Sequence, residues 1–171
     1  MIHDSNLRFP NLPEYTTGGF MRNIFTLVTV ALLLDGGTIF AAGNSNHHGA
    51  VFVGNTTTDK SKSAFTIGLD YEYLLPTEKK QLSGLVILDY ATFDDPVFIA
   101  AAGVVWRPKG GVKFLSAIGH EWVSSHSASM YRLGVGYDIH LSKVSITPVF
   151  NYDRIGSHYA NVYGVDIGFG F

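Results

Sequence analysis

A serine, two histidines and an acid come together in one short stretch of the sequence: His120, Glu121, His126 and Ser127. A serine nucleophile needs a base within hydrogen-bond reach, and that base needs a further group to orient it. Consecutive side chains of a strand point to opposite faces, so His120 and Glu121 would not meet. We expect His126 and Ser127 to lie in a loop. The sequence therefore predicts no catalytic residue, and an enzyme is left as a minor alternative.

Metal, redox and nucleic-acid chemistry have little support in the composition. The sequence has no cysteine, which excludes disulfides, thiolate metal sites and a cysteine nucleophile. His47 and His48 are adjacent, and adjacent strand residues point to opposite faces, which is poor geometry for sharing one metal ion. A formal net charge of −2 gives no electrostatic case for a nucleic-acid partner. We expect no metal site, no cofactor and no nucleic acid.

A larger set of charged residues shares another pattern, because its members alternate with large apolar residues. Between positions 65 and 73, aromatic and aliphatic side chains occupy the odd positions, and Thr66, Gly68, Asp70 and Glu72 occupy the even ones. Alternate residues of a strand share a face, so such a strand has one apolar face and one small or charged face. The charged face predicted along the chain consists of Asp70, Glu72, Asp89, Arg107, Lys113, Glu121, Arg132, Asp138, His140 and Asp166.

Turn residues divide positions 44–171 into eight predicted strands. Gly, Pro, Asp, Asn and Ser interrupt strands for known backbone reasons. The predicted strands are 49–57, 64–75, 82–93, 97–107, 112–123, 130–141, 144–153 and 159–171. Pro148 has no N–H to donate to a ladder, so we expect a bulge or a local break there. We expect no amphipathic helix in this part of the chain.

These strands predict an all-β fold. Eight strands of about 10 residues, an even number, match the smallest transmembrane β-barrel. Charged residues are only 15% of the sequence, below the roughly 25% usual for soluble domains. We therefore expect an eight-stranded antiparallel up-and-down transmembrane barrel over residues 44–171. Its apolar face would meet lipid and its charged face would line the lumen.

A soluble lipocalin-like barrel is the main structural alternative, and it would place aromatic residues inside and charges outside. The small, charged face has too little side-chain volume to form a solvated surface. Tyr71, Tyr73, Trp122 and Tyr137 also lie near predicted strand ends, where aromatic residues of a membrane interface belong. Both observations favour the membrane barrel.

The first 43 residues have a different character. Met21 and Arg22 precede a largely apolar run of eleven residues, 24–34, and Ala41-Ala42-Gly43 follows. A charged start, a short apolar core and a small-residue ending predict a signal peptide at 21–43, with residues 1–20 as an unstructured upstream extension. Eleven residues are too few for a membrane-spanning helix, which needs about 20. A buried helix is the alternative for this run, and the sequence leaves open whether Met1 or Met21 is the start.

The barrel pattern is most specific in residues 51–57, 66–73 and 132–138 and in the closing strand 159–171. These stretches include Gly-Leu-Asp-Tyr-Glu-Tyr at 68–73 and Leu-Gly-Val-Gly-Tyr at 133–137. Here the sequence resembles the small bacterial outer-membrane β-barrel family, eight-stranded proteins often grouped with porin-like or surface-antigen-like barrels. The resemblance covers roughly residues 51–171.

The resemblance implies an integral protein of the bacterial outer membrane with both termini in the periplasm. Its expected partners are outer-membrane lipid and lipopolysaccharide, the barrel-insertion machinery and periplasmic chaperones, and we expect a monomer. In this family an aromatic and apolar closing strand is read by the insertion machinery. The residues that would form this insertion signal are Tyr163, Val165, Ile167, Phe169 and Phe171.

The charged lumen suggests a function. An eight-stranded barrel is just wide enough for its own side chains to fill it, and an unpaired buried charge is costly. Mixed acids and bases therefore favour a lumen plugged by ion pairs and a structural role in the envelope. In such a plug, Arg132 would pair with neighbouring acids of the predicted strands 112–123, 130–141 and 144–153, such as Glu121 and Asp138. The alternatives are a minor porin for small solutes or ions and, less favoured, a lipid-modifying enzyme resembling the lipid A deacylases. Short loops weaken an adhesin role.

Overall fold

The computed structural model describes residues 46–76, 81–108, 110–124, 126–141 and 144–171. The predicted extension at 1–20 and the predicted signal peptide at 21–43 lie outside the described residues. Within the described ranges, no helix is long and apolar enough to cross a membrane.

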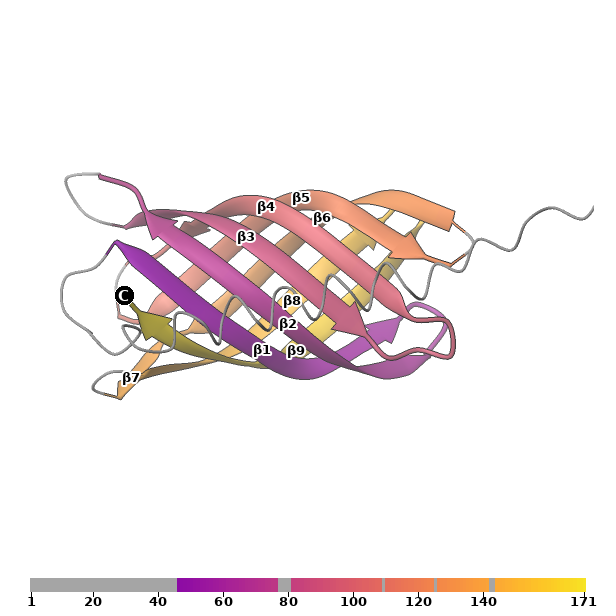
Figure 1. Cartoon of the computed structure of the whole chain (residues 1–171), viewed down its shortest axis with the longest axis horizontal. Helices are drawn as coiled ribbons and strands as arrows, with labels where there is room; N and C mark the ends of the chain where they lie inside the picture. The colour runs from indigo at the N-terminus through magenta and orange to yellow at the C-terminus, as the bar shows by residue number, and fades with distance from the viewer. Residues whose placement is uncertain (1–45, 77–80, 109, 125, 142–143) are drawn as a thin grey trace, which may run out of the picture. The chain divides into compact units, whose positions relative to one another are not determined.

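The strands form one antiparallel sheet that closes into a barrel (Figure 1). They are β1 (His47–Thr58), β2 (Ser63–Leu74), β3 (Leu82–Ala91), β4 (Val97–Trp106), β5 (Val112–Val123), β6 (His126–Tyr137), β7 (Ile139–Leu141), β8 (Val144–Ile155) and β9 (His158–Gly170). β1 closes the barrel by pairing with both β2 and β9. Because β6 and β7 both pair with β8, they are two parts of one strand. The barrel therefore has the eight predicted strand positions.

The interruption between β6 and β7 lies opposite Pro148. Gly136 pairs with Val149 before the gap and Ile139 pairs with Ile146 after it, so each strand advances by three residues and the register is unchanged. Two register positions in between, 137 opposite 148 and 138 opposite 147, are unpaired, and Pro148 cannot donate to the ladder at this point. The predicted local break is confirmed, and it is a break without an inserted residue rather than a bulge.

Burial along the strands follows the predicted alternation. Large apolar side chains are exposed at alternate positions, among them Phe65, Val86, Trp106, Phe114, Ile118, Leu133, Phe150 and Tyr163. The intervening positions point inward and include buried charges such as Glu72, Asp89, Lys113, Arg132 and Asp166. An apolar exterior around a charged interior is the arrangement of a barrel that spans lipid. The lipocalin-like alternative requires the reverse and is wrong.

Two predicted boundaries are wrong at one end of the barrel. The segment 124–129, expected to be a loop, belongs mostly to β6, because the ladder with β5 already begins at the pair Val123 and His126. β8 likewise continues to Ile155 before a tight connection in which Gly156 adopts φ 53°. Glycine adopts a left-handed φ at little cost, so the chain can turn at this residue. The strand therefore continues up to Ile155, beyond the predicted end at 153. The serines of segment 124–129 favour a loop by composition, but residues 126–129 pair with β5 and extend the strand instead.

Part of the interior is apolar. One buried cluster comes from β3, β4 and β5 and contains Leu85, Ile87, Ala101, Val105, Leu115 and Ala117. A second contains Ile99, Met130, Ile155 and Ala160, close to the connections at 92–96, 124–125 and 156–157. Charged residues are also buried in the interior, together with neutral polar ones, and their arrangement is the candidate functional site.

Candidate functional site

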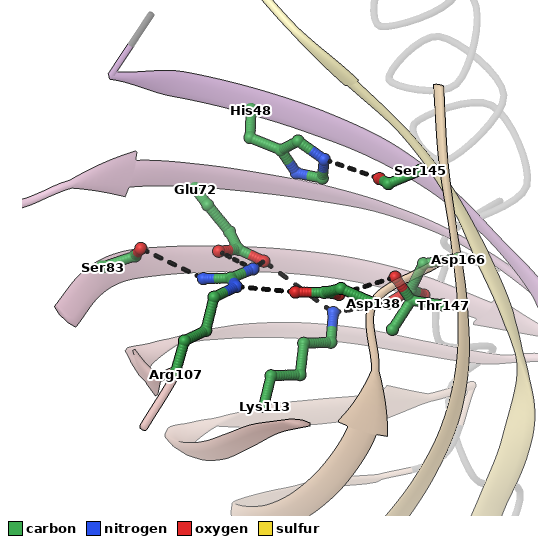
Figure 2. A network of polar contacts seen from close by, with 9 residues as sticks. All are labelled: His48, Glu72, Ser83, Arg107, Lys113, Asp138, Ser145, Thr147 and Asp166. Atoms are coloured by element: carbon green, nitrogen blue, oxygen red, sulfur yellow. Dashed lines mark hydrogen bonds and ion pairs between the residues drawn. The ribbon is translucent and has the colours of Figure 1, made fainter. Parts of the chain in front are cut away.

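Arg107, which directly follows β4, is the centre of one polar network (Figure 2). Its Nε donates to Asp138 Oδ2 at 2.8 Å, and its Nη2 lies 2.8 Å from Glu72 Oε2. Its Nη1 donates to Ser83 Oγ at 3.3 Å. Three separate strands supply these partners, so the guanidinium ties β2, β3 and the junction between β6 and β7 to the end of β4.

Lys113 extends this network along the lumen. Its Nζ lies 2.9 Å from Asp166 Oδ2 on β9 and 3.9 Å from Glu72 Oε1 on β2. Glu72 is therefore shared by Lys113 and Arg107, which Figure 2 shows as one continuous set of contacts. The Lys113, Glu72 and Asp166 side chains are all buried, so these contacts are shielded from solvent. We call the set Arg107, Lys113, Glu72, Asp138 and Asp166 the Arg107 network.

Arg132, in the middle of β6, is the centre of a second group. Its Nε and Nη2 donate to the two carboxylate oxygens of Asp153, each at 2.7 Å, which is the strong bidentate geometry. Its Nη1 donates to Asp89 Oδ2 at 2.7 Å. β5 and β4 separate β6 from β3 in the sheet, so the contact with Asp89 crosses the lumen. We call these three residues the Arg132 triad.

The prediction that Arg132 pairs with an acid of the strands 112–123, 130–141 or 144–153 is confirmed by Asp153. The two acids named for this role, Glu121 and Asp138, are wrong, and the register gives the reason. Arg132 lies opposite Asp153 on β8 and opposite Ala117 on β5. Glu121 lies further along β5, near the hairpin, opposite Ala128. Asp138 is held by Arg107 instead.

Three predicted members lie outside both groups: Asp70, which lines the central cavity, and Glu121 and His140, which lie toward the barrel ends. Glu121 is half-buried near the hairpin end of β5, within electrostatic range of His126 and His158. His140 is exposed on β7 at the barrel end, opposite Ser145, and is not part of the buried interior. A strand position that faces inward at the rim remains in contact with solvent, so alternation alone does not establish burial.

Several inward residues escaped the sequence analysis. Asp153 is completely buried, and it was assigned to a strand end although the alternation of Ser145, Thr147 and Asn151 leads directly to it. Thr147 Oγ1 donates to Asp138 Oδ1 at 2.7 Å. His48 Nε2 lies 3.0 Å from Ser145 Oγ at the start of β1 (Figure 2). Extending the alternation along β8 identifies Ser145, Thr147 and Asp153 as inward residues, but it says nothing of His48 on β1.

Arg107 directly follows β4 and Asp138 lies in the unpaired gap between β6 and β7, and their ionisation follows from their contacts. Burial raises the pKa of Asp138, but hydrogen bonds from Arg107 and Thr147 outweigh it and hold the pKa below its ordinary value. Burial lowers the pKa of Arg107, but Glu72 and Asp138 more than compensate and raise it. Both groups are therefore charged at neutral pH.

The space left in the middle of the lumen is small. A cavity of ≈ 10 Å³ lies between the two groups and is lined by Asp70, Asp89, Lys113, Arg132 and Asp166, among others. One water molecule needs roughly 10–15 Å³ measured in this way. The cavity has room for about one water-sized occupant.

The serine and histidine cluster does not converge on one face. Ser127 pairs with Trp122, and His120 pairs with Ser129, both on the outward side of the β5–β6 hairpin. Glu121 and His126 occupy the alternate positions, which point inward. The His120 ring lies 4.9 Å from the Trp122 ring, as in an interfacial aromatic pair. The described residues also contain no group of three or more acids or histidines able to hold a metal ion.

The predicted insertion-signal residues lie on the outer side of the closing strand. Tyr163 and Ile167 are exposed, and they pair with β1. Phe171 follows β9, and its N–H donates to the carbonyl of His47 at 3.0 Å. The centroid of its ring lies 6.0 Å from that of the His47 ring, and the two rings are stacked. Phe171 therefore contacts β1 through both its backbone and its side chain.

No protein-family model and no curated protein matches the chain. Among solved structures, the barrel is similar to Neisserial surface protein A, with 8% identity over 73% of this chain and 96% of that chain, and a TM-score of 0.54. It is similar to the N-terminal β-barrel domain of Pseudomonas aeruginosa OprF, with 12% identity, 74% and 98% coverage and a TM-score of 0.55. It is also similar to Ail, the attachment invasion locus protein of Yersinia pestis, with 13% identity over 74% of this chain and 97% of that chain, and a TM-score of 0.50. At these identities the likeness establishes the fold, which is that of the small transmembrane β-barrels.

Proposed function

We propose that the protein is an integral barrel of the bacterial outer membrane with a structural role in the envelope and a lumen closed by ion pairs. The observation that carries the proposal is that each basic side chain of the Arg107 network and the Arg132 triad contacts two acids on different strands. Such contacts both fill the lumen and tie strands together. A barrel built in this way is suited to stiffness rather than to transport.

The Arg132 triad argues most strongly against a pore. The Arg132 guanidinium and Asp89 meet across the lumen, and their side chains are 3% exposed. The cavity beside them has room for about one water-sized occupant. A permeating ion needs a continuous path along which it is bound only weakly. Opening such a path here requires breaking a buried ion pair.

Outer-membrane residence fits the same proposal. An apolar exterior with aromatic residues such as Trp106, Trp122 and Tyr137 is suited to lipid and its interfaces. Lipopolysaccharide would then contact the outer part of this surface, and the insertion machinery and periplasmic chaperones would handle the unfolded chain. The connections 59–62, 92–96, 124–125 and 156–157 are short, so we do not extend the attachment function named for Ail to this chain.

Planar-bilayer conductance of the purified protein tests the closed lumen, together with mass spectrometry of lipid A from the expressing cells. We expect no steady conductance and an unchanged lipid A. Discrete, charge-selective openings would contradict the plug and favour a minor porin. A change in lipid A mass that disappears in Ser127→Ala or His126→Ala would favour a lipid-modifying enzyme.

A further inference from the structure

The lumen contains more acid than base. The Arg107 network and the Arg132 triad hold three basic side chains, Arg107, Lys113 and Arg132, and five carboxylates, each in contact with a basic nitrogen. Asp70 is a sixth carboxylate in the same space, because it lines the central cavity with Asp89, Asp166, Lys113 and Arg132. The three basic groups already have partners, so the charge of Asp70 is not balanced by them.

Asp70 differs from the other five in its contacts. Its Oδ1 atom is buried and has no hydrogen-bond partner among the described residues. The residues directly opposite it on the neighbouring strands are Ala50 on β1 and Ile87 on β3, and neither side chain can donate. A buried carboxylate oxygen that has neither a donor nor a cation against it is unfavourable.

The charged groups that face Asp70 do not supply the missing partner. Asp166 on β9 and Asp89 on β3 add negative charge around it. Lys113 on β5 and Arg132 on β6 face it as well, but they contact Asp166, Glu72, Asp89 and Asp153. The site therefore combines an unpartnered oxygen, a local excess of negative charge and a cavity of ≈ 10 Å³.

We propose that Asp70 is the lumen's binding site for one monovalent cation, either a proton from solvent or an alkali ion no larger than the central cavity. A proton would convert the carboxylate into a neutral acid. An alkali ion would lie against Oδ1 and replace the missing donor. Among the described residues, no group of three or more acids or histidines is arranged so that it could hold a metal ion, so we do not assign a divalent metal to the site. This inference rests on the lumen geometry and stands whether or not the barrel has an envelope role.

The test compares wild type with Asp70→Asn, both refolded in zwitterionic micelles at neutral pH. In the proton arm, infrared difference spectroscopy should show one protonated carboxyl group in wild type that the variant lacks. In the alkali arm, wild type should unfold at a higher temperature in sodium or potassium chloride than in choline chloride at equal concentration, and the variant should not. Either difference supports the site and identifies its occupant. Identical behaviour of the two proteins in both arms would overturn it.

A matched control distinguishes loss of the cation site from the general effect of removing a carboxylate from the lumen. Asp138→Asn removes a carboxylate that has Arg107 as its partner and does not line the central cavity, so it should lower the unfolding temperature while keeping the cation signal of wild type. If Asp70→Asn does not refold, Asp70→Ser removes the charge with a smaller side chain. The infrared band and its loss on raising the pH can also be followed in wild type alone. Absence of both the band and the alkali effect in wild type contradicts the proposal without any variant.

Discussion

The Arg132 triad and the Arg107 network use the same chemistry in different surroundings. The Arg132 side chain is 3% exposed and lies in the middle of a strand, whereas the Arg107 side chain is 27% exposed and lies beyond the end of one. Coulombic attraction and desolvation both grow as water is removed. From this comparison we expect that the position of an ion pair along the barrel, more than its residue types, determines how much the fold depends on it.

Removing the arginine from each group tests the comparison most strongly. Arg132→Ala leaves two buried carboxylates without a cation and should cost about 3–5 kcal/mol of unfolding free energy. Arg107→Ala should cost less, about 1.5–3 kcal/mol, because water reaches the vacated site. Urea unfolding of barrels refolded into lipid measures both, and Arg154→Ala, at an exposed position of β8, is the control. Equal losses for Arg132 and Arg107 would remove the distinction between the two groups.

A charge placed one residue along β6 tests the other side of the same strand. Leu133 is 49% exposed on the outer face, next to the buried Arg132. Leu133→Arg should cost about 2–4 kcal/mol if the position faces the middle of the bilayer. Leu133→Met retains an apolar side chain and should be close to neutral. An arginine tolerated at 133 in lipid would show that this face does not meet hydrocarbon.

The facing of β6 was accessible to sequence reasoning, and its partners were not. Alternation placed Arg132 inside and Leu133 outside, because a strand has a period of two whatever its neighbours are. Which acid meets Arg132 depends on hairpin lengths and on the register around the whole barrel. Asp89 adds a contact across the lumen, which no local pattern encodes. The same reasoning failed at the rim, where His140 has the correct phase and is exposed.

The dependence of stability on pH in the acid range tests whether Arg107 and Thr147 hold Asp138 in its charged form. The pKa of Asp138 is lower in the folded barrel, so its contribution is complete above the ordinary aspartate pKa of about 3.9 and is lost as pH falls through the folded value. We therefore expect the unfolding temperature, measured between pH 6 and pH 2, to fall more steeply for wild type than for Asp138→Asn at the acid end, roughly below pH 4. Parallel profiles would mean that Arg107 and Thr147 do not hold the carboxylate.

Labelling the two barrel ends tests which compartment each group faces, with little expected effect on stability. Asp94, in the β3–β4 connection, and Pro76, after β2, are exposed at opposite ends. If both termini are periplasmic, a membrane-impermeant thiol reagent should label Asp94→Cys on intact cells and Pro76→Cys only after the outer membrane is permeabilised. The reverse pattern would place the Arg107 network at the cell surface.

The closed lumen depends most directly on the contact between Arg132 and Asp89, because it crosses the barrel interior. A double-mutant cycle of Arg132→Ala and Asp89→Ala in lipid isolates their coupling from the separate cost of each substitution. A direct buried ion pair predicts a coupling energy of about 1–3 kcal/mol, with the double variant less destabilised than the two single losses combined. Additivity within about 0.5 kcal/mol would show that the two side chains do not meet across the lumen and would contradict the plug.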